Sequence, residues 1–437
     1  MKMNRVTPRR PSGFPEYTPA EQLAFNKLLD SIRSSYQIAG FTPIETPALE
    51  LAEVLLAKGG GETEQEVFRF GKGSKDYVMH YDLTVPLARY VAEHQNDLVF
   101  PFRRSQIQKV WRAERAQKGR AREFYQCDAD VVGEADVVVD GELIALAAST
   151  MRKLAVGDFV IRVNNRKILT GLYDSLGIAD QSTELLRIID KLEKIGEATV
   201  IELLEKAGLK EDAIKQLLTA VELRGSVDET LKRLRGLGIT NTIFIQGLEE
   251  LERTLLSASA CGVQIDELEI DCSIARGLDY YTATVFETVM TEMPELGSVC
   301  SGGRYDDLAQ YYTDRSLPGV GISVGVTRLF DGLRDSGRLD LAQETTSRVI
   351  ILPMLETAWV PAGELAQQLR GAGIACELVL ADTKPAKVFA RADKLNVPYV
   401  AVIGEQELIA NTITLKDMQT GDQKELKGDD VVRYIKG

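Results

Sequence analysis

Apolar and polar positions divide the first fifty residues into a helical stretch and an extended one. Apolar side chains recur at helical spacing over Pro19–Ala39, which predicts a helix that ends near Gly40. Phe41–Glu50 contains two threonine–proline pairs, which disfavour a helix, so this stretch is predicted to be extended. A second helix is expected from about Leu51.

The remainder of the N-terminal part combines strand patterns with one helical stretch. The helical stretch is Asp140–Leu154. The strand patterns fall at Tyr77–Leu83, Gln106–Arg115 and Glu123–Val132. Because the strands follow one another and do not alternate with helices, this part is predicted to be α+β with hairpins.

Lys167–Ala260 has a different pattern, with short leucine-rich helical stretches and almost no strand signal. The predicted helices are Leu185–Ile195, Thr199–Ala207 and Asp212–Val221. Strand patterns return at Glu267–Cys272 and Thr282–Met290, and glycines punctuate Ser301–Arg328. We therefore expect a helical insertion that interrupts the core in sequence.

From Arg348 onward, short apolar strands alternate with segments of helix length. The predicted strands are Val349–Leu352, Ala375–Leu380 and Tyr399–Ile403, and the predicted helices are Val360–Leu369 and Pro385–Leu395. A hairpin around Gly421 and a helix from Asp429 follow. This alternation predicts a small α/β domain with a partly parallel sheet.

These patterns predict two core parts, an insertion, a linker and a C-terminal domain. The expected divisions are 1–166 and 261–335 for the core, 167–260 for the helical insertion, 336–347 for the linker and 348–437 for the α/β domain.

Composition narrows the classes of function. Hydrophobic residues make up 44% of the 437 residues and no apolar run is long enough to cross a bilayer, so we expect a chain with no membrane partner. The N-terminus lacks the pattern of a secretory signal, which makes a cytoplasmic location the expectation. Two histidines and five scattered cysteines argue against a metal site built by the chain and against metal or triad hydrolases.

Positive charge is concentrated in Pro101–Arg122, although the net charge of the chain is −13. This window holds eight basic residues and one acid, Glu114. A strand, a loop with Gly119 at its tip and a returning strand would let residues of one face converge on a polyphosphate. The alternative is a solvated basic hairpin, which composition alone favours.

A second candidate is the run Arg276–Thr282, in which an arginine and a glycine precede two adjacent tyrosines. Arginine offers a fixed charge and a fork that suits carboxylate or phosphate, and tyrosine hydroxyls can orient a small polar ring. Tyr280 and Tyr281 can equally be core residues on alternate faces of a strand. The residues alone lead to an anion site.

Ala275–Glu287 resembles the signature segment of histidyl-tRNA synthetases and their close relatives. Val110–Gly133 resembles the second motif of class II synthetases, and Gly319–Leu329 resembles the third. Further matching segments, in order, are Phe41–Glu50 (the first, dimer-building motif), Tyr81–Pro86 and Ser301–Asp306. An ordered set that spans nearly the whole chain is far more specific than any one motif.

The resemblance implies a class II synthetase core, with a mixed, mainly antiparallel sheet flanked by helices, a helical insertion and a C-terminal α/β anticodon-binding domain. It implies a homodimeric histidine–tRNA ligase. Such an enzyme activates L-histidine with ATP and Mg²⁺ to histidyl-adenylate and pyrophosphate, and then transfers histidine to the 3′ end of tRNA(His). The substrate carboxylate is already ionised, so the first step needs no general base.

The resemblance also implies roles for individual residues. ATP would bind Arg112 at the α-phosphate, Glu114 near the adenine amine, and Arg120 and Arg328 at the outer phosphates. Arg276, beside Arg112, would be the second catalytic cation. The implied histidine-binding positions are Asp82, Leu83, Thr84, Arg112, Gln126, Asp130, Arg276, Tyr280, Tyr281 and Tyr305. Asp82 and Asp130 would meet the ammonium and the imidazole, in an order that the sequence leaves open.

Two rival functions are compatible with parts of the pattern. One is a regulatory subunit of ATP phosphoribosyltransferase, which reuses the synthetase core but usually lacks the anticodon domain and the ATP-binding arginines. The other is a tRNA-binding module without aminoacylation. The chain keeps the arginines and the C-terminal domain, but it departs from the family pattern at Thr327, where glutamate is usual, and at Ala283, where glycine is usual.

Overall fold

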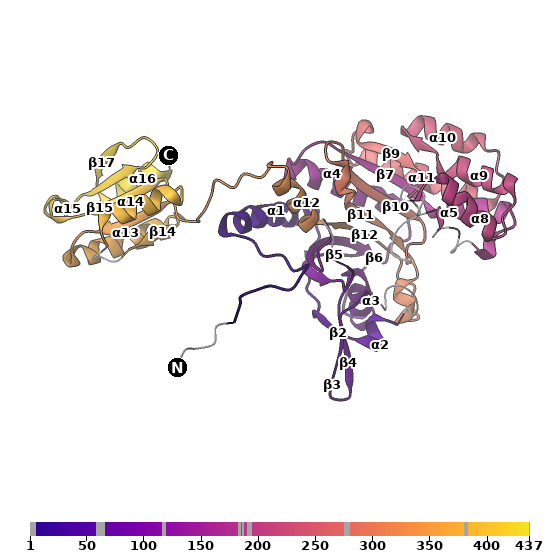
Figure 1. Ribbon diagram of the computed structural model, residues 1–437, viewed down its shortest axis with the longest axis horizontal. Helices are drawn as coiled ribbons and strands as arrows, with labels where there is room; N and C mark the ends of the chain where they lie inside the picture. The colour runs from indigo at the N-terminus through magenta and orange to yellow at the C-terminus, as the bar shows by residue number, and fades with distance from the viewer. Residues whose placement is uncertain are drawn as a thin grey trace. The chain divides into compact units, whose positions relative to one another are not determined.

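The computed structural model describes residues 6–57, 66–115, 119–181, 185, 188–189, 195–274, 280–379 and 383–436. They belong to two compact units, drawn in Figure 1. We name them the large unit (Met1–Pro15 and Leu28–Arg338) and the small unit (Glu16–Lys27 and Leu339–Gly437).

A nine-stranded sheet forms the centre of the large unit. Its strands lie in the order β1 (Thr42–Pro43), β5 (Phe102–Trp111), β6 (Glu123–Val132), β12 (Gly319–Val324), β11 (Ser298–Tyr305), β10 (Thr284–Met290), β7 (Phe159–Asn165), β9 (Leu268–Asp271) and β8 (Arg224–Gly225). The pairs β1–β5 and β7–β9 are parallel, and the other neighbours are antiparallel. The expected mixed, mainly antiparallel sheet is confirmed.

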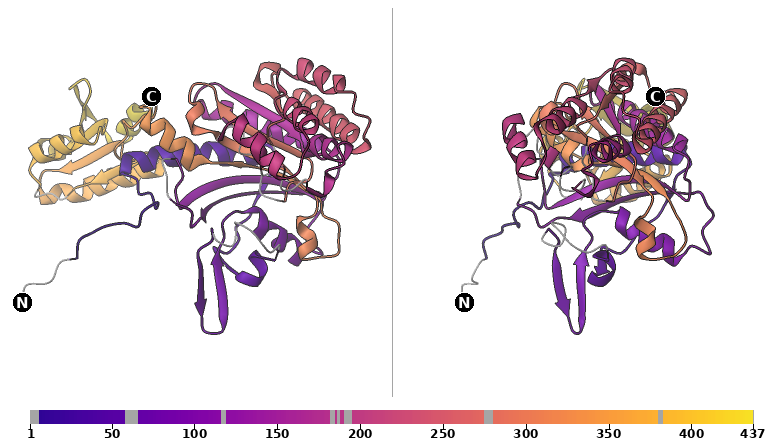
Figure 2. Two further views of the ribbon diagram at one scale, coloured as in Figure 1. Left: turned by 45° about the vertical axis from the view of Figure 1, so that its right-hand side comes forward. Right: turned by 90° about the vertical axis from the view of Figure 1, so that its right-hand side faces the viewer.

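Helices α4 (Val138–Leu154) and α11 (Thr242–Ala260) pack together over this sheet (Figure 2). Glycine makes their close approach possible: a Cβ at Gly141 would lie 2.4 Å from the carbonyl oxygen of Thr254. Among the described residues before Ser336, the other α-helices are α1 (Pro19–Ile38), α2 (Ala52–Leu55), α3 (Thr84–Glu93), α5 (Arg166–Ser175), α8 (Glu197–Lys206), α9 (Glu211–Val221), α10 (Val227–Gly236) and α12 (Val326–Asp335).

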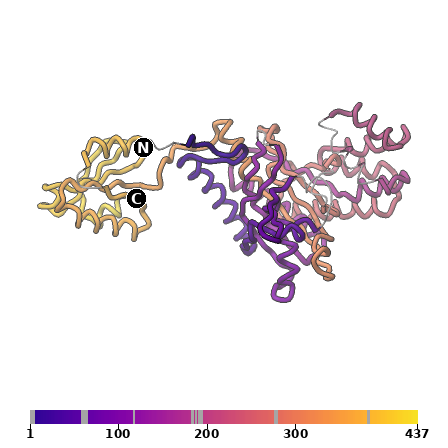
Figure 3. Tube along the Cα trace, turned by 60° about the horizontal axis from the view of Figure 1, so that its bottom comes forward, coloured from indigo at the N-terminus to yellow at the C-terminus, as the bar shows by residue number. Residues whose placement is uncertain are grey.

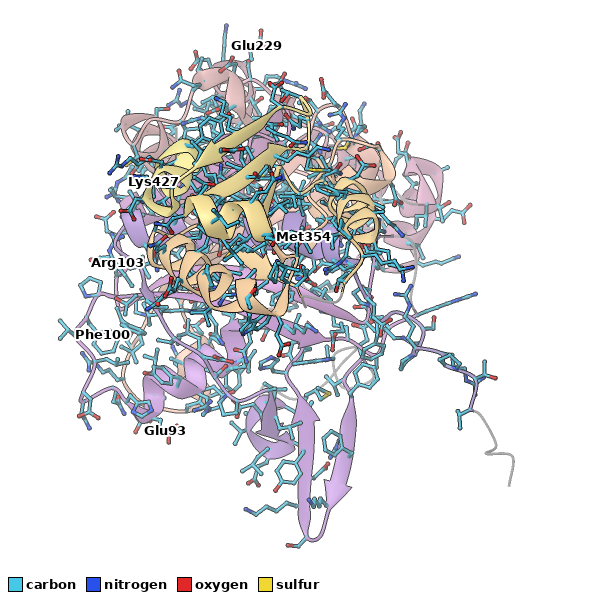
Figure 4. The ribbon with its side chains drawn as sticks, turned by 90° about the vertical axis from the view of Figure 1, so that its left-hand side faces the viewer. Glu93, Phe100, Arg103, Glu229, Met354 and Lys427 are labelled. Atoms are coloured by element: carbon cyan, nitrogen blue, oxygen red, sulfur yellow. The ribbon has the colours of Figure 1, made fainter. Side chains whose placement is uncertain are left out.

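A small three-stranded sheet accompanies the large one, in the order β2 (Leu49–Leu51), β4 (Lys75–Met79) and β3 (Arg69–Lys72). The β3–β4 hairpin projects from the large unit in Figure 1, and Figure 4 shows it with its side chains. A strand was expected over Tyr77–Leu83, but β4 ends at Met79 because the chain turns there into α3.

The small unit has a five-stranded sheet, which Figure 3 traces in its C-terminal colours. The strand order is β14 (Cys376–Leu378), β13 (Val349–Pro353), β15 (Tyr399–Ile403), β16 (Ile413–Asp417) and β17 (Gln423–Leu426). Its helices are α13 (Trp359–Gly371), α14 (Pro385–Lys394), α15 (Glu405–Ala410) and α16 (Gly428–Lys436). The first three strands are parallel and the last two antiparallel, as the alternation of apolar strands and helices predicts.

Two further stretches depart from the sequence expectation. The region expected to be helical contains β8, which pairs with β9 at the edge of the large sheet, and a strand of two residues has too little pattern to be detected. The helix expected from Leu51 is the short α2. Most of the helix expected over Leu185–Ile195 lies outside the described residues.

No helix in the described ranges combines the length and the apolar character needed to cross a bilayer.

Candidate active site

Four neighbouring strands of the large sheet bring together residues that are far apart in the sequence. Asp130 of β6 lies opposite Arg104 on β5 and Gly321 on β12, and Gly321 lies opposite Gly303 on β11. Directly opposed residues of paired strands share one face of a sheet. These residues therefore form the floor of a single site.

Asp130 is held by a hydroxyl and a guanidinium. The Tyr305 hydroxyl donates to one carboxyl oxygen at 2.6 Å, and a terminal nitrogen of Arg104 lies 2.9 Å from the other. Glycine is needed opposite, because a Cβ at Gly321 would lie 2.0 Å from Asp130 Oδ1. Burial raises the pKa of Asp130, and Arg104 and Tyr305 oppose that rise.

Asp82 caps the first turn of α3 from inside the site. Its Oδ1 accepts from the backbone N–H of Val85 at 3.1 Å, and its Oδ2 accepts from the Tyr280 hydroxyl at 3.3 Å. The two neighbours of Asp82 in the predicted site are also placed here: the Leu83 carbonyl accepts from Arg104 at 3.2 Å, and Thr84 is the buried first residue of α3.

Three tyrosines border the same space. The ring centroid of Tyr280 lies 5.0 Å from that of Tyr281 and 6.0 Å from that of Tyr305. A Cβ at Gly303 would lie 2.8 Å from the Tyr281 ring, so the glycine permits this approach. Burial, followed by the charges of Asp130, Asp128 and Asp82, raises the pKa of Tyr281.

Gln126 lies on β6, four residues before Asp130 and on the same face. Its amide nitrogen donates to the Ser323 hydroxyl at 2.9 Å. Its amide oxygen is buried and has no hydrogen-bond partner within the described part of the chain. Such an acceptor is available to a donor of the substrate.

The arginines expected to bind ATP converge at the end of the β5–β6 hairpin. Arg112 and Arg120 each have a guanidinium nitrogen 4.0 Å from a carboxyl oxygen of Glu114. Arg328, at the start of α12, donates to the Gly119 carbonyl at 3.3 Å. Burial and then the charges of Arg120 and Arg112 lower the pKa of Arg328. The positive charges of Arg112, Arg120 and Arg328 repel one another, and a bound polyanion would relieve this repulsion.

Arg112 joins this cluster to the amino-acid side of the site. Its Nε donates to the Tyr81 carbonyl at 3.2 Å, one residue before Asp82. Its guanidinium also lies 5.3 Å from the centre of the Phe124 ring. Arg276, which was expected beside Arg112, lies outside the described residues.

Sequence reasoning missed two buried members of the site, Arg104 and Asp128. Arg104 was counted only as one charge of a basic hairpin, yet its side chain is fully buried beside Asp130. The available signal was the alternation Gln126–Asp128–Asp130, which puts a third polar side chain on the same strand face.

The unusual Thr327 fits the structure well. Its hydroxyl accepts from the backbone N–H of Tyr125 at 2.9 Å and so ties the start of α12 to β6. His80, by contrast, is fully buried, and its Nε2 lies 2.7 Å from the Lys109 carbonyl, which is a structural role.

Replacing Asp82 with asparagine is expected to weaken the pH dependence of stability. Burial raises the pKa of Asp82 from 3.8 to about 6, so between these values the folded chain binds more protons than the unfolded chain. This contribution to stability is present below pH 4 and is lost as the pH rises through about 6. Urea denaturation at several pH values measures the free energy of unfolding. Between about pH 4 and 7 this free energy should fall less with rising pH for Asp82→Asn than for the wild type, and an equal fall would contradict the raised pKa of Asp82.

Comparisons with known proteins agree with the order of the motifs. A family model described as histidyl-tRNA synthetase matches residues 13–329, and a model described as anticodon binding domain matches residues 348–437. A histidine–tRNA ligase of Clostridium tetani is 46% identical over 439 residues and is covered in full, as is this chain.

Solved structures give the same result. The crystal structure of histidyl-tRNA synthetase from Nostoc sp. PCC 7120 is 39% identical, with a TM-score of 0.89 over 99% of both chains. A structure from Bacillus halodurans C, described as an ATP phosphoribosyltransferase regulatory subunit/histidyl-tRNA synthetase, has a TM-score of 0.77 at 23% identity, over 92% of this chain and 99% of its own, and supports the fold alone. The chain belongs to the histidyl-tRNA synthetase family.

Proposed function

We propose that this chain is a histidine–tRNA ligase, which makes histidyl-adenylate from L-histidine and ATP and then transfers histidine to the 3′ end of tRNA(His). One observation carries the proposal beyond family membership. Arg112 belongs to the arginine cluster and hydrogen-bonds the residue next to Asp82, so a polyanion site and a buried carboxyl pocket adjoin. An amino-acid carboxylate held there would face the α-phosphate.

The first step is an in-line displacement at the α-phosphorus. The ionised carboxylate of histidine attacks, an oxygen–phosphorus bond forms, and the bond to the pyrophosphate leaving group breaks. Arg112 would hold the α-phosphate, with Arg120 and Arg328 at the outer phosphates and Glu114 at the adenine amine. In the second step a ribose hydroxyl of the terminal nucleotide attacks the adenylate carbonyl, and AMP leaves.

The geometry suggests an orientation for histidine. Three pairs of directly opposed residues on β5 and β6 lie at increasing distance along the strands from the Arg112 end. They are Gln108–Gln126, then Gln106–Asp128, then Arg104–Asp130. Asp82, beside the Arg112-bound carbonyl, would take the α-ammonium group. Asp130, at the far end beside Tyr305, would take the imidazole.

Arg276 is proposed as the second catalytic cation. Arg276→Ala is expected to lower the rate of ATP–pyrophosphate exchange by about a hundredfold, because one cation would be lost from the developing negative charge. Single-turnover formation of the adenylate would measure the loss at the chemical step. An unchanged rate would remove Arg276 from the mechanism.

The remaining partners are proposed on the same basis. Mg²⁺ would enter with ATP as part of the substrate and offset part of the charge of the phosphates beside Arg112, Arg120 and Arg328. The extended stretch Phe41–Glu50 would build a homodimer interface, 348–437 would bind the anticodon, and 167–260 would form the helical insertion between core parts 1–166 and 261–335. The linker would be 336–347, and the enzyme would act in the cytoplasm.

The test is histidine-dependent ATP–pyrophosphate exchange, measured beside aminoacylation of purified tRNA. Both activities are expected. Exchange without any effect of histidine would refute the proposal, as would tRNA retention without exchange, which is the behaviour of a binding module. Absence of both reactions would favour a regulatory subunit.

A further inference from the structure

Asp128 occupies the middle of the strand face that carries the proposed histidine-binding residues of β6. Successive side chains of a strand point to opposite faces, so Gln126, Asp128 and Asp130 share one face. Across the sheet, Asp128 lies opposite Gln106 on β5 and Ser323 on β12. Its position alone places it between two residues proposed to contact the substrate.

The carboxyl group of Asp128 is buried and incompletely satisfied. The residue is 2% exposed, and its Oδ1 has no hydrogen-bond partner within the described ranges. Its Oδ2 lies 3.8 Å from Arg104, whose same nitrogen lies 2.9 Å from Asp130. The guanidinium of Arg104 is therefore closer to Asp130 than to Asp128, and the Ser323 side chain supplies a hydrogen bond to the Asp128 carboxyl group. A buried carboxyl oxygen without a donor is costly unless a ligand supplies one.

Several groups of the candidate site interact with Asp128. They include Arg104 on β5, Asp130 on β6, Ser323 on β12, Asp82 before α3, and Tyr281; Tyr36, Cys127 and Cys300 also interact electrostatically with Asp128. Burial raises the pKa of Asp128, Arg104 opposes this rise, and the charge of Asp130 adds to it. When two neighbouring carboxyl groups share one cation, the state in which one is ionised and the other is protonated is favoured.

We propose that Asp128 is a specificity-determining residue, a second carboxyl group that contacts the imidazole and brackets the ring together with Asp130. The inference rests on the proposed function and deepens it. A neutral imidazole has one N–H donor and one bare nitrogen acceptor. A carboxylate and a carboxylic acid on one strand face offer the matching acceptor and donor, so each ring nitrogen would meet one carboxyl group.

The first test uses Asp128→Ala and measures exchange at varied histidine and varied ATP. The KM for histidine is expected to rise by about 10- to 100-fold, the scale of a lost hydrogen bond that involves a charged group. The KM for ATP should stay within about threefold, because no phosphate contact is changed. Asp128→Asn keeps the volume and one acceptor oxygen, and it should give a smaller rise. Equilibrium binding of histidine without ATP should weaken in parallel.

The second test uses the two ring-N-methylated isomers of histidine as inhibitors of exchange, because each isomer blocks one ring nitrogen. In Asp128→Ala, the preference for histidine over one isomer should fall by about tenfold or more, and the preference over the other should change little. A merely structural role for Asp128 would change both preferences equally.

Glu267→Gln is the matched control, since it alters a carboxyl group of the same unit that pairs with Arg152 at the surface. It should leave both KM values unchanged. If the wild-type protein shows no histidine-dependent exchange, the proposed function fails. If it does, but Asp128→Ala leaves the KM for histidine unchanged or raises both KM values equally, only the role of Asp128 is overturned. Binding data for Asp128→Asn decide the case if the alanine variant does not fold.

Discussion

Arg112→Ala is expected to lower the rate of ATP–pyrophosphate exchange by about a hundred- to thousandfold, the cost of removing a preorganised donor from developing charge. The effect should exceed that of Arg120→Ala or Arg328→Ala, because Arg112 also contacts the amino-acid side of the site. Its guanidinium lies near Glu114 in the arginine cluster, and its Nε fixes the chain just before Asp82. Steady-state exchange at saturating ATP and histidine measures the loss.

Two further variants identify the cause of that loss. Arg112→Lys keeps the charge but loses the planar fork, and it should retain an intermediate rate. Arg152→Ala removes an arginine that pairs with Glu267 at the surface of the same unit, and it should leave exchange unchanged. If Arg112→Ala retained more than about a third of the wild-type rate, its assigned role would be wrong.

Asp140→Ala is expected to destabilise the large unit by about 3–5 kcal/mol, because it removes the buried carboxylate that pairs with Arg304 and leaves the guanidinium with the partly exposed Asp306. Arg304 is 2% exposed and Asp140 is fully buried. The Nε of Arg304 lies 3.1 Å from both carboxyl oxygens, and the same side chain donates to the backbone carbonyl of Glu134 at 2.9 Å. The pair thus fixes β11 to the start of α4, on the opposite face of β11 from Tyr305.

The two tryptophans make this measurement possible, because Trp111 lies in the large unit and Trp359 in the small one. In a Trp359→Phe background, fluorescence during urea denaturation reports the large unit alone. Asp140→Ala should shift the midpoint well below that of this background. Replacing both partners, Asp140→Leu with Arg304→Met, should recover most of the loss, because the two buried charges are removed together and Asp306 is partly exposed to solvent. If Asp140→Ala has the same urea midpoint as the Trp359→Phe protein, the Asp140–Arg304 pair does not stabilise the large unit.

Local patterns predicted the parts of the fold that depend on local sequence. The β5–β6 hairpin follows from alternation on either side of Gly119, and the small unit follows from its regular succession of strands and helices. The placement of β12 between β6 and β11 does not follow from any local pattern, because pairing between distant strands depends on the register of the whole sheet.

The same distinction separates the site residues that were predicted from those that were missed. Asp82, Asp130 and Tyr305 stand in recognisable motifs. Arg104 shows no motif, and its importance appears only when β5 and β6 are set in register and bury its charge against Asp130. The sequence also could not decide whether Tyr280 and Tyr281 pack in the core or contact a ligand, because the answer depends on tertiary contacts. In the structure Tyr280 packs against Tyr281 and also hydrogen-bonds to Asp82.

The position of β12 in the sheet also determines when the pocket can exist in a growing chain. Gln126 and its partner Ser323 are 197 residues apart in sequence, and Asp130 and its partner Tyr305 are 175 apart. At about 5–20 residues per second, a ribosome needs roughly ten seconds or more to make the chain between them. During that interval the acidic face of β6 lacks its neighbouring strand β12, so an incomplete polypeptide carries the arginine-bearing hairpin without the rest of the carboxyl pocket. Affinity for histidine would therefore report completion of the catalytic unit.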